Sequence, residues 1–154
     1  MVPTDPYVTG LLQENFFAQK SPVAGRLVVV LRGHLEGREL ELIPQPSRAV
    51  TAGEVHELVA VDEPKAGPGR VVNRVAFLGF VEFLSGGVLV AGDEVRVGGR
   101  VVGRLAGYDL THMPNHMNLV ILTPGALSGE EMGLELGAAV GFAGSGEERE
   151  GTHG

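Results

Sequence analysis

The stretch DEVRVGGRVVG is the feature that most constrains how this chain can fold. Val95 and Val97 alternate with polar residues before Gly98–Gly99, and valines resume after it. Glycine accepts the positive φ angles that a two-residue hairpin turn requires, so the stretch predicts a tight β-hairpin. In that hairpin Val97 faces Arg100 and Val95 faces Val102, which places the valines on one face of the pair.

Short apolar runs separated by glycine turns recur along the whole chain. The 154 residues include 24 glycines, and valine is abundant throughout. This composition predicts many short strands, tight turns and little helix. Because a small antiparallel sheet must protect its edges, we predict an all-β fold, a small closed antiparallel β-barrel of about six to eight strands.

The length of the chain predicts one domain. We expect residues 23–143 to form the barrel and residues 1–22 to form an N-terminal arm, since prolines break regular structure there. The apolar residues of the arm could pack on the barrel or on a second copy in a homodimer. The polar, glycine-rich residues 144–154 predict a disordered tail.

The composition excludes several classes of function. Cysteine is absent, which excludes disulfides, thiolate metal sites and a cysteine nucleophile. The formal net charge is −7 and no basic cluster is present, so nucleic acid is not an expected partner. No stretch resembles a signal peptide or a membrane span, so we expect a cytoplasmic protein without membrane association.

The stretch GGVLVAGDEVRVGGRVVGRLAGYDLTHMPNHMNLVI resembles the central part of the glucitol/sorbitol-specific IIA component of the bacterial sugar phosphotransferase system. Gly92, Gly98, Ala106–Gly107 and His116 stand at places comparable to that family's turns and strands. The front GRLVVVLRGHLEGRELELIP and the segment Gly137–Phe142 resemble its opening and closing strands. The resemblance implies a small closed β-barrel.

The same resemblance implies a phosphoryl group carried on histidine. The family's phosphoacceptor lies in a Phe-rich strand ahead of the hairpin. The strands of this chain that align with it, LVAVDE and FLGFVE, contain no histidine and offer Asp62 or Glu82 nearby. The barrel could therefore have a function other than carrying a phosphoryl group, because fold does not determine function.

The stretch YDLTHMPNHMN contains the best candidates for chemistry. Asp109, His112 and His116 are residue types that bind divalent metals. Pro114 lies between the histidines, so a helical His-x-x-x-His pair cannot be assumed. Three interpretations stay open: a polar turn with a hydrogen-bonded histidine, a binding or catalytic loop without metal, and a metal site.

A small-molecule enzyme is the function that these residues favour. His116 stands at the entrance of a strand, where we expect its ring to point into the barrel or its mouth and act with Asp109 in acid/base catalysis. Asn115 beside it, and the Asn73 and Arg74 pair that interrupts an apolar run, are candidates for binding an anionic substrate. Lyase, isomerase, cyclase or hydrolase chemistry would fit, with or without a divalent metal. The alternatives are a non-catalytic binding module and a divergent phosphocarrier.

Two further histidines lie outside that stretch. We expect His34, in a polar link, to be exposed on the surface. We expect His56 to be solvated as well, because it lies on the opposite side of its segment from Val55.

Overall fold

A computed structural model describes residues 20–144 of the chain. The expected arm up to residue 19 and the expected tail from residue 145 lie outside the described residues.

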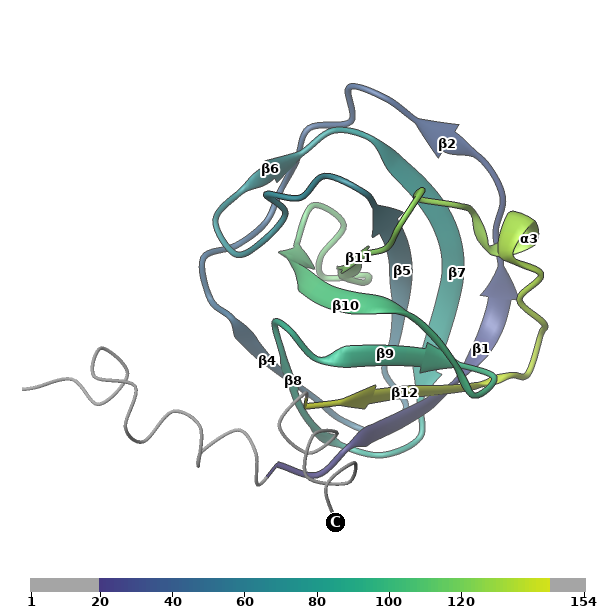
Figure 1. The fold of residues 1–154 in the computed structure, drawn as a ribbon. Coiled ribbons are helices and arrows are strands. Elements are labelled where there is room, and N and C mark those ends of the chain that lie inside the picture. Colours follow the sequence, from purple (N-terminus) through teal and green to yellow (C-terminus); the bar gives the residue numbers. More distant parts are fainter. Residues whose placement is uncertain (1–19, 145–154) are drawn as a thin grey trace, which may run out of the picture.

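Seven strands pair edge to edge in one ring, which confirms the all-β fold class (Figure 1). Their order around the ring is β1, β12, β9, β10, β11, β5 and β7, and β7 pairs back with β1. Their bounds are β1 Val23–Val30, β5 Val55–Val61, β7 Val75–Phe83, β9 Glu94–Val97, β10 Arg100–Asp109, β11 Asn118–Leu122 and β12 Ala139–Ala143.

Shorter elements attach to this ring. The short strand β2 continues the line of β1 along β7, and the ribbons β3–β6 and β4–β8 are separate two-stranded pairings. The one helix of the described part, α3, begins at a capping box and is too short to cross a membrane. Their bounds are β2 His34–Leu35, β3 Leu40–Glu41, β4 Ser47–Val50, β6 Val71–Val72, β8 Gly87–Val90 and α3 Gly129–Met132.

One pairing of the ring departs from the predicted antiparallel pattern. Strands β5 and β11 run parallel, with Asn118 opposite Glu57 and Leu122 opposite Val61. Parallel neighbours need a long crossover connection, and the chain from β6 to β10 provides it. The other pairings in the ring are antiparallel.

The main core fills the interior of the ring. Every one of the seven strands contributes buried apolar side chains to it, and the largest come from aromatic residues. The aromatic members are Phe83, Tyr108 and Phe142. Alternation along each strand accounts for this arrangement, because every second side chain points to the same face.

A second apolar cluster covers part of the outer face of the ring. Val59 and Val120 alternate with core residues and therefore point outward, where Leu40 and Leu42 pack on them. Gly107 makes room for this contact, since a Cβ atom there would lie 3.2 Å from Leu42. Strands such as β5 and β11 are thus apolar on both faces because both faces are covered.

The predicted hairpin is present with one shift. Val97 lies opposite Arg100, as expected, but Val95 lies opposite Gly103 rather than Val102. A β-bulge between Val101 and Gly103 adds one residue to the second strand, which displaces every later pair by one.

Candidate functional site

Four side chains form a row across the outer face of the ring, which we call the outer row. Asp109 on β10, Asn118 on β11, Glu57 on β5 and Phe80 on β7 are successive register partners. Residues directly opposite each other in a sheet share a face, so these four side chains lie next to one another. The outer row borders the second apolar cluster, because Val120 belongs to that cluster and lies two residues beyond Asn118.

The Asp109 end of the outer row is held by hydrogen bonds. Asn118 Nδ2 donates to Asp109 Oδ2 over 2.9 Å, and the Thr111 hydroxyl donates to Oδ1 over 2.7 Å. Asp109 is only 3 % exposed, so these bonds fix the direction of its carboxylate. The Oδ1 atom of Asn118 is buried without a partner in the described structure.

The segment from residue 110 to residue 117, which we call the histidine loop, brings two imidazole rings together. The N–H groups of Asn115 and His116 both donate to the carbonyl of His112, over 2.9 and 3.3 Å. This turn forms although it contains Pro114, whose peptide bond with Met113 is cis. The ring centroids of His112 and His116 lie 5.1 Å apart as a result.

The His116 ring lies against the outer row, not inside the ring of strands or at its mouth as expected. Its Nε2 atom is 3.4 Å from Glu57 Oε1, and its edge contacts Phe80 with centroids 5.2 Å apart. The reason is alternation: His116 shares its side with Asn118, whereas Met117 between them points into the core. Asn115 Nδ2 lies 2.9 Å from His116 Nδ1 and can donate to it.

Glu57 is the carboxyl group that faces His116, and the sequence alone did not single it out. Burial raises the pKa of Glu57, and the nearby charges of His116, His112 and Arg38 offset this only in part. Its side chain is 12 % exposed. A carboxyl group with a raised pKa exchanges protons closer to neutrality than an ordinary glutamate does. The available signal was that Glu57 is acidic yet alternates with the apolar Val59 and Val61.

A pocket of about 390 Å³ opens beside Asp109. This volume is in the range of small-molecule sites. Three acidic residues line it, together with apolar residues of the segment that follows β3. The lining residues are Glu39, Glu41, Leu42, Ile43, Pro44, Asp109, Leu110 and Thr111.

His56 is buried, so the expectation that it is solvated was wrong. It is 5 % exposed, whereas Val55 beside it is 40 % exposed. Alternation with Leu58 and Ala60, both core residues, places His56 on the inner face. Its Nδ1 atom accepts the Met117 N–H over 2.9 Å, and its Nε2 atom lies 2.7 Å from Glu54 Oε1.

The carboxylate of Glu54 completes this network. The backbone N–H and the hydroxyl of Thr51 donate to Glu54 Oε2 over 2.7 and 3.0 Å. Burial alone would raise the pKa of Glu54, but the hydrogen bonds from His56 and Thr51 outweigh it and lower that pKa. The charged form of Glu54 is therefore favoured by folding.

We expect the stability difference between the wild type and Glu54→Gln to depend on pH, because folding favours the charged form of Glu54. A depressed folded-state pKa stabilises the fold above the usual value of 4.5, and the stabilisation is lost as the pH falls through the lowered pKa. Near neutral pH the free energy of unfolding of the wild type should exceed that of Glu54→Gln by about 1 kcal/mol. The difference is small because solvent screens this partly exposed carboxylate. Urea unfolding from about pH 3 to about pH 7 measures this difference. A gap that stays constant over this range would contradict the assignment, and Glu135→Gln, an exposed site, is the control.

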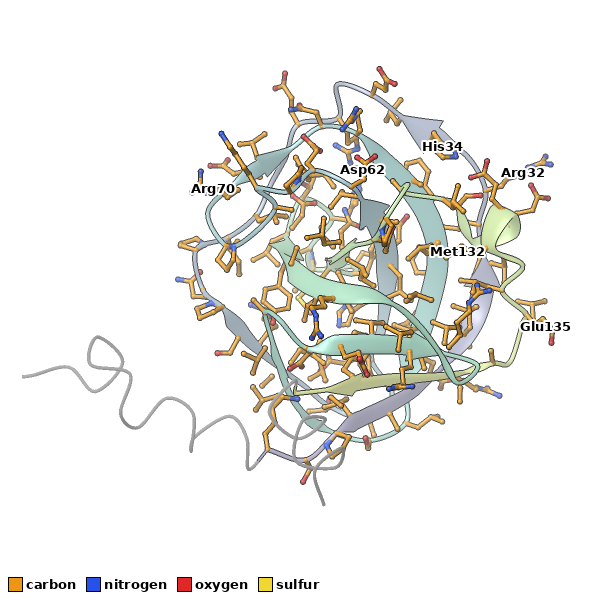
Figure 2. The ribbon with its side chains drawn as sticks, viewed as in Figure 1. Arg32, His34, Asp62, Arg70, Met132 and Glu135 are labelled. Carbon is orange, nitrogen blue, oxygen red and sulfur yellow. The ribbon has the colours of Figure 1, made fainter. Side chains whose placement is uncertain are left out.

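Asn73 and Arg74 are not brought to His116. Arg74 is exposed and pairs with Asp62 over 3.1 Å, and the backbone N–H groups of both residues donate to Glu63. Figure 2 shows Asp62 at the upper rim of the ring. Both residues precede β7, which starts opposite Val61, roughly 13 Å along β5 from Glu57.

His34 is exposed, as expected. Its side chain is 48 % exposed and its Nε2 atom lies 2.6 Å from Glu131 of α3. In Figure 2 His34 lies on β2, on the same side of the molecule as α3.

The predicted metal ligands are not gathered at one point. Within residues 20–144, no group of three or more His, Asp or Glu side chains is arranged to hold a metal ion. The rings of His112 and His116 are neighbours, and His116 lies beside Glu57 on β5. Asp109 is on β10, two strands away from β5, and two strand spacings are roughly 10 Å.

Comparison with known proteins places most of the chain in one family. A family model described as a family of unknown function, DUF6917, matches residues 17–143. No curated protein and no solved structure matches the chain.

Proposed function

We propose that this chain, which belongs to the DUF6917 family of unknown function, is an enzyme that binds a small molecule in the pocket beside Asp109 and transfers a proton with Glu57 and His116. The observation that carries the proposal is the largely buried Glu57 carboxyl group, which lies 3.4 Å from His116 Nε2 on the same outer row as Asp109 of the pocket wall.

The contacts of His116 assign different roles to Glu57 and His116. With the Asn115 amide donating to Nδ1, the ring proton stays on Nε2, which faces Glu57. Glu57 can then accept a proton from a ligand that extends from the pocket along the outer row, and the Nε2 proton of His116 stabilises the Glu57 carboxylate before the transfer. Proton transfer of this kind begins lyase, isomerase, cyclase and hydrolase reactions.

The lining of the pocket indicates the charge of the ligand. Glu39, Glu41 and Asp109, all acidic, are among its lining residues. Carboxylates attract ammonium groups and accept hydrogen bonds from hydroxyl groups, but they repel phosphate. This favours an amine or a polyol as ligand, and it gives less support to an anionic substrate or to the phosphocarrier alternative.

The proposal can be tested by mapping ligands on isotope-labelled protein. We expect small amines or polyols to shift backbone NMR signals of residues 39–44 and 109–118. Asp109→Asn should weaken this binding, and Glu57→Gln should retain binding but lower turnover about 100-fold or more. His34→Gln removes a histidine–glutamate pair elsewhere on the molecule and should change neither quantity.

Each other result points away from the proposal in a specific direction. Binding by the wild type without turnover of any ligand would support a non-catalytic binding module. Labelling of His112 or His116 by a phosphoryl donor protein would support a divergent phosphocarrier. Ligand shifts confined to another surface would rule out the pocket itself.

A further inference from the structure

We infer that His56 is a positioning residue, which acts across the sheet to hold His116 against Glu57. His56 points into the core, whereas His116 and Glu57 lie on the outer face, so the connection runs through the backbone. This role of His56 rests on the proposed function only for its purpose, which is to keep His116 beside Glu57 for proton transfer. The geometry itself can be measured without a ligand.

The hydrogen bonds of His56 permit a single tautomer. Nδ1 accepts the N–H of Met117, so this nitrogen carries no proton. The ring proton is therefore on Nε2, which donates to Glu54 Oε1. Glu54 is in turn held by the two donors of Thr51. The imidazole is thus oriented from both sides and cannot turn without losing a buried hydrogen bond.

Both backbone polar groups of Met117 are anchored on β5. Its N–H is donated to the His56 side chain, and its carbonyl accepts the N–H of Glu57 over 3.0 Å. Met117 is 1 % exposed, so its N–H would be buried without a partner if His56 Nδ1 were absent. The His56 ring takes the place of the next rung of the β5–β11 ladder, just before β11 begins at Asn118.

The position of His116 follows from this anchor. His116 is the residue before Met117, and Glu57 is the residue after His56. The bonds that join Met117 to β5 thus determine how far the His116 ring stands from the Glu57 carboxyl group and from Phe80. If the Met117 N–H were released, the histidine loop would be free to lift from the outer row.

Two substitutions separate the two nitrogens of His56. Asparagine places an acceptor near the position of Nδ1, so His56→Asn can keep the bond to Met117 and lose the one to Glu54. Glutamine places a donor near the position of Nε2, so His56→Gln can keep the bond to Glu54 and lose the one to Met117. The readouts are the ring nitrogen shifts of His116 and its nuclear Overhauser contact with Phe80, with the melting temperature measured beside them.

We expect the His116–Phe80 contact to persist in His56→Asn and in Glu54→Gln, and to be lost in His56→Gln. Loss of the contact in folded His56→Asn, or its persistence in folded His56→Gln, would overturn the inference. If His56→Gln does not fold, His56→Ala takes its place. The His116–Phe80 contact should then persist in His56→Asn and be lost in His56→Ala. A failure to find any ligand that binds would count against the proposed function alone, because the His116 signals are measured on the free protein.

Discussion

Gly79→Ala is expected to destabilise the fold by at least about 3 kcal/mol, a large part of the stability of an ordinary domain. A Cβ atom on Gly79 would lie 2.1 Å from the carbonyl oxygen of Val29. Gly79 is paired with Val30 of β1 and Leu58 of β5; the Leu58 pairing is next to a register shift, and a second shift lies one pair away on the β1 side. The backbone approaches closely at such bulges, and a neighbouring strand cannot move aside as a side chain could.

The matched control is another glycine inside a strand of the ring. A Cβ atom on Gly141 of β12 would meet no atom within 4 Å, so Gly141→Ala should change stability by about 1 kcal/mol or less. Urea unfolding of the two variants beside the wild type measures the difference. Equal effects of the two substitutions would show that the close approach at Gly79 relaxes at little cost.

Tyr108→Ala is the second substitution with a large expected effect, a loss of about 3–5 kcal/mol. Tyr108 is fully buried in the core, and its hydroxyl lies 3.0 Å from the carbonyl of Leu89 and 3.1 Å from that of Pro46. Burial raises the pKa of Tyr108, with a smaller contribution from Asp93, so the hydroxyl stays a donor. The side chain therefore ties the β4–β8 ribbon to β10 as well as filling the core.

Tyr108→Phe separates these two contributions. It keeps the ring and removes the hydroxyl, so the expected loss is about 1 kcal/mol. The Pro46 carbonyl also accepts the Ala91 N–H, which limits the cost of losing the tyrosine donor. Chemical denaturation measures both variants. A Tyr108→Phe loss as large as that of Tyr108→Ala would mean that the hydroxyl, and not the ring, holds the ribbon in place.

Local patterns in the sequence predicted the strand content and the hairpin turn at Gly98–Gly99. These features depend on alternation and on glycine, which can be recognised within a few residues. The exact partner of Val95 could not be predicted, because the bulge before Gly103 lies where β11 approaches β10 closely. A Cβ atom on Gly103 would lie 2.3 Å from the Leu122 carbonyl, and that contact is not visible in the local sequence.

The candidate site was predicted in part. The sequence pointed to His116 and Asn115, but Glu57 and His56 come from a strand far away in the sequence. Met117 and His56 are 61 residues apart, and they meet only because β5 and β11 pair in parallel. The exposed Val55 misled the interpretation of β5, because its apolar character suggested the wrong face for His56.

The place of β12 in the ring has a consequence for the newly made chain. Among residues 20–144, β12 is the last strand in sequence, yet it lies between β1, the first, and β9. Until β12 arrives, β1 and β9 both present unpaired backbone groups, and such open edges recruit strands of other molecules. A nascent chain that still lacks β12 therefore exposes two strand edges that are paired in the folded protein.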